Sequence, residues 1–143
     1  MKPEVVECGQ MPACDPNSST ASSLHIGTDG FVAYDSQADV ILLKCEGCIQ
    51  IVAGPNDEAF HRHRFYALGL HHDAIQELTN SPWIQELSTT FDRDGLSDRL
   101  PGGRHFVLAL KECSVDIAAK SIEAIGRYAS HHDAMRAALT LAK

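Results

Sequence analysis

Residues 40–52 read VILLKCEGCIQIV, two apolar runs on either side of a polar centre. Residues 40–43 and 49–52 have the length and the aliphatic content of buried strands. Glycine adopts positive φ without a steric penalty, so Glu46-Gly47 can form the two-residue turn of a hairpin. We therefore predict a hairpin at Glu46-Gly47; the alternative is one long bent strand with a bulge at Gly47.

Short apolar runs on both sides of this segment predict further strands. They are residues 31–34 (FVAY), 106–110 (FVLAL) and 115–119 (VDIAA). The last two runs are expected to pair as antiparallel neighbours across a turn at 111–114. Residues 74–78 (AIQEL) fit either a further strand or a helical turn.

Two helices are predicted. The first begins near Pro82, because Ser81 can accept a hydrogen bond from a free backbone N–H and proline tolerates the first helical position. The second runs on from Ser121, where apolar residues recur at helical spacing. We therefore expect an α+β fold, with a mostly antiparallel, meandering sheet of about six strands and two helices packed on one face.

The N-terminal part of the chain differs in composition from the rest. Residues 9–30 are rich in Ser, Pro, Asn, Thr and Asp and show no apolar periodicity. We expect residues 1–29 to be a flexible N-terminal tail and residues 30–143 to form a single α+β domain. The first residues lack the apolar stretch of a secretory signal, and five cysteines, an odd number, suit a reducing compartment. The expected location is the cytoplasm, and no apolar run is long enough to span a bilayer.

The net charge of the chain indicates which class of partner it can bind. Nineteen acidic against twelve basic residues leave a formal net charge of -7. This charge opposes binding to nucleic acid, because affinity for phosphate backbones comes largely from Lys and Arg. An acidic surface can instead attract a basic protein; the simpler interpretation is that the charge only maintains solubility.

Cys45 and Cys48 form a Cys-x-x-Cys pair, which can hold half of a tetrahedral zinc site or act as a redox couple. The sequence contains no second such pair, so zinc would have to recruit histidines such as His61 and His63. A redox pair is expected where a strand meets a helix, whereas this pair lies between two apolar runs. We favour two ordinary thiols and expect no cofactor, with zinc at Cys45, Cys48, His61 and His63 as the alternative.

Residues 55–66 (PNDEAFHRHRFY) gather carboxylates, imidazoles, guanidiniums and aromatic rings in an expected loop. A carboxylate that orients an imidazole can do acid–base chemistry. We favour a simpler interpretation, in which Asp57 and Glu58 cap a short helical turn and the aromatic residues anchor the loop. No set of nucleophile, base and orienting residue is recognisable in the sequence. No catalytic residue is therefore assigned, and the prediction leans against an enzyme.

Five blocks of the sequence stand out together: GPNDEA at 54–59, HRFY at 63–66, GL at 69–70, NSPWI at 80–84 and HFVLALKE at 105–112. In these blocks the chain resembles a family of small uncharacterised bacterial proteins. The family carries Pro-Asn-Asp-Glu-Ala and Asn-Ser-x-Trp-Ile blocks and a late strand that ends in a His-Asp-Ser turn; the similarity spans residues 38–120. This chain departs at that turn, where it has Lys111-Glu112-Cys113, so no role of the family's histidine there is carried over. The resemblance implies a bacterial cytoplasmic setting and points to residues 56–58 and Trp83, without an assigned activity.

These observations favour a non-catalytic protein-binding module, immunity-like or escort-like toward a basic partner. The alternative is a small metal-dependent or ligand-dependent enzyme that uses the loop from Asp57 to His63. A homodimer built through an unpaired sheet edge is a third alternative. The candidate binding residues are Asn56, Asp57, Glu58, His61, His63, Tyr66 and Trp83.

Overall fold

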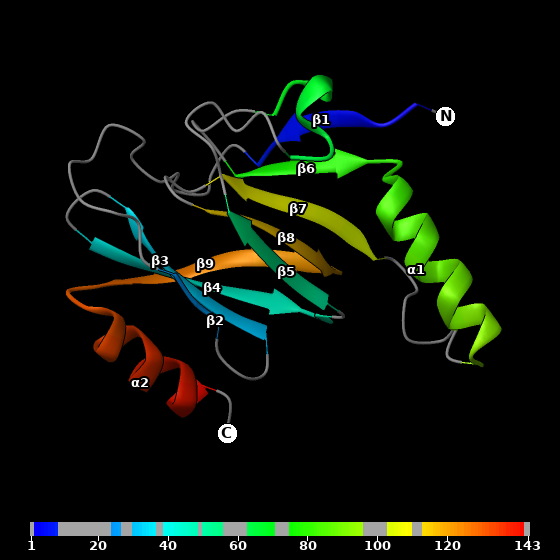
Figure 1. Cartoon of the computed structure of the whole chain (residues 1–143). Coiled ribbons are helices and arrows are strands. Elements are labelled where there is room, and N and C mark those ends of the chain that lie inside the picture. Colours follow the sequence, from blue (N-terminus) through cyan, green and yellow to red (C-terminus); the bar gives the residue numbers. More distant parts are fainter. Residues whose placement is uncertain are drawn as a thin grey trace.

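The computed structural model describes residues 2–8, 24–26, 30–36, 39–48, 50–55, 63–70, 75–95, 103–109 and 113–141. Within these ranges the chain forms nine strands in two antiparallel sheets, two α-helices and a short 3-10 helix (Figure 1). The predicted α+β class is confirmed. The strands are divided between two sheets, whereas we expected a single meander of about six strands.

The larger sheet has the strand order β1-β6-β7-β8-β5. Its strands are β1 (Glu4–Glu7), β6 (Gln76–Thr79), β7 (Arg104–Ala109), β8 (Cys113–Ala119) and β5 (Gln50–Pro55). The smaller sheet has the order β2-β3-β4-β9. Its strands are β2 (Leu24–Ile26), β3 (Phe31–Ser36), β4 (Asp39–Glu46) and β9 (Ser121–Tyr128).

Two of these strands fall within the stretch that we expected to be a tail. β1 pairs with β6, and β2 pairs with β3. Val5 of β1 also packs against a cluster of buried apolar side chains, which explains why this short strand belongs to the folded domain. Expecting a tail over all of residues 1–29 was therefore wrong for these two segments.

The chain passes between the two sheets at Gly47. β4 pairs with β9 and β5 pairs with β8, so β4 and β5 are not partners, and the predicted hairpin at Glu46-Gly47 is wrong. The alternative, one long bent strand with a bulge at Gly47, is also wrong, because β4 ends at Glu46 and β5 begins at Gln50 in the other sheet. The return crossing from β8 to β9 lies beside the bend, where the Lys120 N–H donates to the Glu46 carbonyl at 2.8 Å. Gly47 has a φ of 58°, the left-handed region that glycine tolerates best.

Gly47→Ala is expected to lower the free energy of unfolding by about 1–2 kcal/mol, because a residue with a Cβ is strained at this φ. The added Cβ would also lie 2.8 Å from Cγ of Lys120, whose flexible side chain can move aside. Urea denaturation measures the loss. Gly54→Ala is the matched control, since a Cβ at Gly54 meets nothing within 4 Å. An equal loss in both variants would contradict the role of the bend.

Three of the remaining strand predictions and the first helix are confirmed, whereas the predicted start of the second helix is wrong. The strands at 31–34, 106–110 and 115–119 are confirmed as parts of β3, β7 and β8, and β7 pairs with β8 as expected. The first helix is confirmed as α1 (Pro82–Arg93), with Ser81 as its N-cap. The second helix, α2 (His131–Leu141), begins ten residues later than predicted, because residues 121–128 form β9 along the edge of β4.

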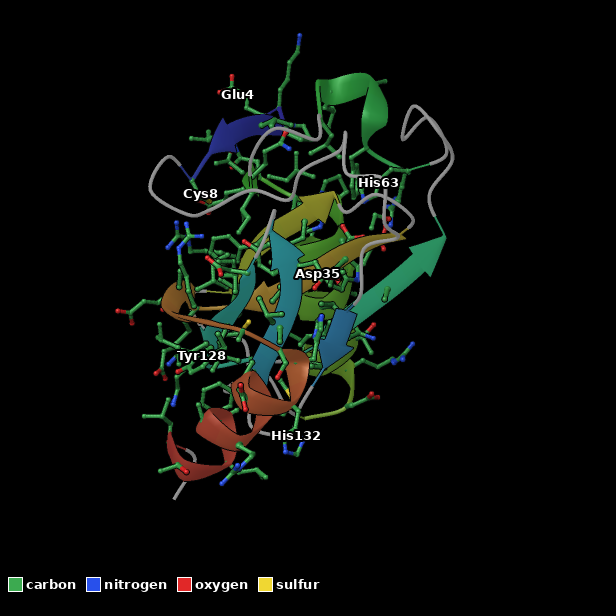
Figure 2. The ribbon with its side chains drawn as sticks, turned by 90° about the vertical axis from the view of Figure 1, so that its left-hand side faces the viewer. Glu4, Cys8, Asp35, His63, Tyr128 and His132 are labelled. Carbon is green, nitrogen blue, oxygen red and sulfur yellow. The ribbon has the colours of Figure 1, made fainter. Side chains whose placement is uncertain are left out.

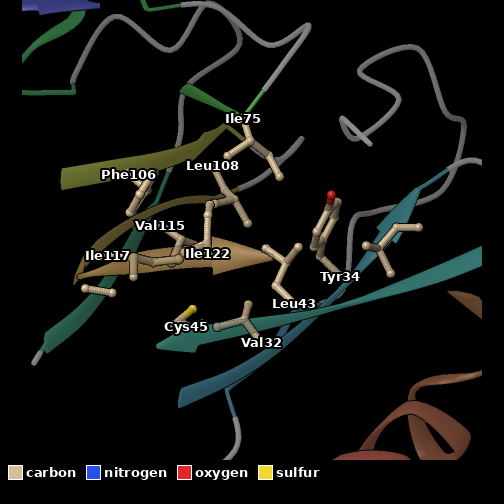
Figure 3. Packing of buried hydrophobic residues seen from close by; sticks show 12 residues of the cluster. Val32, Tyr34, Leu43, Cys45, Ile75, Phe106, Leu108, Val115, Ile117 and Ile122 are labelled. Carbon is tan, nitrogen blue, oxygen red and sulfur yellow. The ribbon is translucent and has the colours of Figure 1, made fainter. Parts of the chain in front are cut away.

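Apolar side chains fill the space between the two sheets (Figure 3). This cluster consists of Val32, Tyr34, Ile41, Leu43, Cys45, Ile75, Phe106, Leu108, Val115, Ile117, Ala119 and Ile122. A second cluster lies under α2, which packs on β3, β4 and β9, and a third lies on the outer face of the larger sheet. α1 contacts β7 of the larger sheet, so the expectation that both helices pack on one face of a single sheet was wrong. No helix in the described ranges is both long enough and apolar enough to cross a membrane.

Candidate functional site

A pocket of about 290 Å³ opens on the outer face of the larger sheet, beside residues 63–70 and the start of α1. His63, which Figure 2 labels, lies toward the end of the molecule that carries β1 and away from α2. The pocket is lined by Val52, Gly54, His63, Arg64, Phe65, Trp83, His105, Ser114 and Asp116.

The alternation of side chains along the strands places the polar residues on this face. Phe106 and Ile117 point into the core between the sheets, so their neighbours His105 and Asp116 point outward. Asp116 lies opposite Val107 on one side and opposite Val52 on the other. Cross-strand partners share a face, which brings His105, Asp116 and Val52 to the same pocket.

The Asp116 carboxylate joins two imidazoles. His105 Nε2 lies 2.6 Å from Asp116 Oδ1, and His63 Nε2 lies 3.0 Å from both carboxylate oxygens. The three side chains come from β8, from β7 and from the segment before the 3-10 helix η2 (Tyr66–Leu68). The cluster therefore ties the segment that begins at His63 to the sheet.

The remaining hydrogen bonds fix the tautomer of both imidazoles. The Phe65 N–H donates to His63 Nδ1 at 3.1 Å, so the proton of a neutral His63 is on Nε2. An ionised carboxylate only accepts, so His105 also carries a proton on Nε2. When this ring is neutral, the Ser81 hydroxyl, 2.7 Å from Nδ1, donates to it. Both rings therefore donate to Asp116.

These donors keep Asp116 ionised. Burial would raise the pKa of Asp116, but the hydrogen bonds from His105 and His63 outweigh it and hold the pKa below its usual value. The side chain is still 20% exposed, so the carboxylate is reachable from the pocket. When both imidazoles are neutral, the cluster carries one negative charge, and attraction to either imidazole in its protonated form lowers the pKa of Asp116 further. A carboxylate with a lowered pKa is a weak base, which suits binding of a cation better than uptake of a proton.

Ser81, His105 and Asp116 are the residue types of a hydrolytic triad, but their arrangement assigns Ser81 another role. Ser81 is 4% exposed and does not line the pocket. Its Oγ accepts the Ile84 N–H at 3.4 Å as the N-cap of α1 and donates to His105. Ser81 therefore orients His105 and anchors α1, and a ligand in the pocket does not meet its hydroxyl.

Ser81→Ala is expected to lower the free energy of unfolding by about 2 kcal/mol, because the helix loses its cap and His105 Nδ1 loses its donor. Nitrogen chemical shifts of His105 should report a change in its tautomer balance, which loss of a helix cap alone would not cause. Ser88→Ala, within the same helix, serves as control and is expected to be neutral or slightly stabilising. Equal stability of the two variants would refute the link between the cap and His105.

Aromatic rings surround His105 and form the walls of the pocket. The ring centroid of His105 lies 4.7 Å from that of Trp83 and 5.5 Å from that of Phe65, both edge-to-face. The guanidinium of Arg64 stacks over Phe65 and makes two hydrogen bonds to Glu86 of α1. The hydrogen bonds to Glu86 raise the pKa of Arg64, so its positive charge is already paired at the rim.

The structure brings two of the predicted binding residues to this pocket, His63 and Trp83. Tyr66 begins the neighbouring 3-10 helix η2, and its side chain lies outside the described part of the chain. The predictions at Asn56, Asp57, Glu58 and His61 also fall outside the described residues. Sequence reasoning did not assign Ser81, His105 and Asp116 to a site. The available signal was a charged residue, Asp116, in the middle of an apolar strand.

Cys45, Cys48 and His63 are the residues considered for zinc that the structure describes. Cys45 lies in the core between the sheets, where burial, and then the neighbouring Cys48, raises its pKa to about 12. Burial also raises the pKa of Cys48. Zinc binds the thiolate form, which these shifts disfavour. Nε2 of His63 carries a proton directed at Asp116, and no group of three His, Cys, Asp or Glu side chains in the described ranges is arranged to hold a metal ion.

Comparisons of the chain with protein-family models, with curated proteins and with solved structures find no match. The pocket and the ionised carboxylate within it are therefore the features that indicate a function.

Proposed function

We propose that the protein is a non-catalytic binding module that holds a positively charged side chain of a basic protein partner in the Asp116 pocket. The observation that carries this proposal is a partly buried, ionised carboxylate that two imidazoles fix in an aromatic pocket. A fixed carboxylate binds a guanidinium or an ammonium through charge-assisted hydrogen bonds.

The surroundings of Asp116 support a cation as the bound group. Trp83 offers an aromatic ring, on whose face a cation is stabilised, and Val52 offers apolar surface for the alkyl stem of an arginine or a lysine. The hydrogen bonds of Arg64 go to Glu86, so the guanidinium acts on Asp116 only through a weaker electrostatic attraction. The net charge of -7 adds a long-range attraction for a basic protein.

The enzyme alternative has less support from this geometry. Each imidazole directs its Nε2 proton at Asp116, and each Nδ1 already accepts a hydrogen bond. Neither ring offers an acceptor nitrogen to a ligand, and Asp116 is a weak base.

Binding of a cation can be tested with the intrinsic fluorescence of Trp83, the only tryptophan in the chain and part of the pocket wall. We expect a saturable change on titration with N-acetyl-arginine methylamide, with a Kd in about the millimolar range for so small a ligand. The citrulline analogue has nearly the same shape without the charge and should cause no change. An equal response to both compounds, or no response to either, would overturn the proposal.

Val52→Lys provides a variant that keeps the buried cluster intact. Val52 is 44% exposed and lines the pocket, so a lysine there should fold normally and direct its own ammonium at Asp116. This variant is expected to lose the arginine response. The matched control is Val6→Lys on β1, which changes the charge equally at a residue that is 48% exposed and lies outside the pocket lining. The control should bind as the unmodified protein does.

A further inference from the structure

The outer edge of β5 lies beside the pocket. β5 is the last strand of the larger sheet and pairs with β8 alone among the strands that the structure describes. Its residues Gln50, Val52 and Ala53 are exposed, and Val52 and Gly54 line the pocket. Among the described residues, no strand uses the backbone groups on the outer side of β5, at the mouth of the pocket, and a further strand could pair with them.

The composition of β5 is unusual for an edge strand. Such strands are commonly protected from pairing by charged side chains, by proline or by bulges. At the opposite edge of the same sheet, β1 begins and ends with glutamate. β5 has the sequence QIVAGP, which contains no charge, and its only proline is the last residue. Residues 50–54 therefore contain neither a charged side chain nor a proline that would protect this edge.

The register of β5 links this edge to Asp116. Val52 lies opposite Asp116, so a residue of an added strand that pairs with Val52 would lie on the same row and could point to the same face. Two strand spacings, about 10 Å, would separate its backbone from that of Asp116. Arginine and lysine side chains are long enough to cross Val52 and place their charge at the carboxylate, with their alkyl stems on Val52.

We infer that the partner binds by adding an extended segment to the outer edge of β5, with an arginine or lysine of that segment in the Asp116 pocket. This inference rests on the proposed function and specifies the form of the partner. Backbone hydrogen bonds to β5 supply affinity, and the pocket selects the basic side chain.

A second copy of this chain fits the same edge less well. Two β5 strands could pair with each other, but QIVAGP contains no basic residue to pair with Asp116. Charge complementarity therefore favours a basic segment of a different protein.

The test compares three probes by Trp83 fluorescence. The first is acetyl-Thr-Val-Thr-Arg-Thr-Val-Thr-amide, which combines strand-forming residues with one arginine. The second is the same peptide with citrulline in place of arginine, and the third is N-acetyl-arginine methylamide. We expect the arginine peptide to bind at least about tenfold more tightly than the single arginine derivative, and the citrulline peptide to lose most of this affinity.

N-methylation separates backbone pairing from side-chain contacts. Successive backbone N–H groups of a strand point to opposite sides. Methylating every second amide on the side that faces β5 therefore blocks pairing, whereas methylating every second amide on the opposite side does not. Only one of the two methylated peptides should fall to the affinity of the single arginine derivative. Equal affinity of all arginine probes would overturn this inference and leave the proposed function standing, whereas identical binding of arginine and citrulline compounds would overturn both.

Sedimentation of the full chain tests whether a second copy of the chain, rather than a different protein, binds the outer edge of β5. A monomer that binds the arginine peptide is the expected result. A dimer that Val52→Lys dissociates and Val6→Lys does not would assign the edge to a second copy and overturn the inference.

Discussion

Asp116→Asn is expected to lower the free energy of unfolding by about 3 kcal/mol. The carboxylate accepts hydrogen bonds from His105 and His63, whereas an asparagine amide has one oxygen and one NH₂ group. The NH₂ group would face an imidazole N–H, and two donors cannot satisfy each other. The backbone hydrogen bond from Phe65 prevents His63 from shifting its proton to Nδ1 without a further loss.

Urea denaturation at neutral pH measures this loss. Asp92→Asn is the matched control, because it removes the same charge from an exposed residue of α1 and should change stability by no more than about 0.5 kcal/mol. A loss below about 1 kcal/mol for Asp116→Asn would show that the two imidazoles do not depend on the carboxylate. Since this variant is destabilised, Val52→Lys remains the cleaner test of ligand binding.

The part of the fold that sequence predicts well is the pairing of β7 with β8. Both contain short apolar runs, broken in β8 by Asp116, and the sequence places only a few polar residues between them, so the pattern and the connection favour the same antiparallel pair. α1 was predictable for a similar reason, since Ser81 and Pro82 form a local start signal. Residues close together in the sequence therefore determine both the β7–β8 pair and the start of α1.

The predictions that were wrong concern choices that distant contacts decide. Glu46-Gly47 suits a hairpin turn, but β4 pairs with β9 in the smaller sheet and β5 pairs with β8 in the larger sheet. Residues 121–128 have helical spacing of apolar side chains, yet pairing with β4 outweighs that weak preference. A local pattern contains no information on which strand lies alongside.

The candidate site was predictable only in part for the same reason. His63 and Trp83 stood out as polar and aromatic residues near loops and helix starts. Their connection to His105 and Asp116 depends on the segment before η2 folding over β7 and β8, which brings together residues that are 53 positions apart. The predicted strand 115–119 contains Asp116, but the predicted strand 106–110 begins one residue after His105, so the sequence did not place the two side chains on one face.

Acid is expected to remove the stabilisation that Asp116 provides. Hydrogen bonds from His105 and His63 lower the pKa of Asp116 in the folded state against the opposing effect of burial. The contribution is present in full above the pKa of an unfolded aspartate, about 3.9, and is lost as pH falls through the lower pKa of the folded state.

The unfolding free energies of the unmodified protein and of Asp116→Asn should therefore converge between about pH 5 and pH 2. A protonated Asp116 is uncharged and similar in shape to asparagine, so little should separate the two proteins once the carboxylate has been neutralised. Asp92→Asn, measured in parallel, should stay close to the unmodified protein throughout. A difference of about 3 kcal/mol that persists at pH 2 would mean that asparagine disturbs the packing rather than the charge. Convergence would establish that the negative charge of Asp116, the group proposed to hold a cation, is what holds His63 and His105 in place.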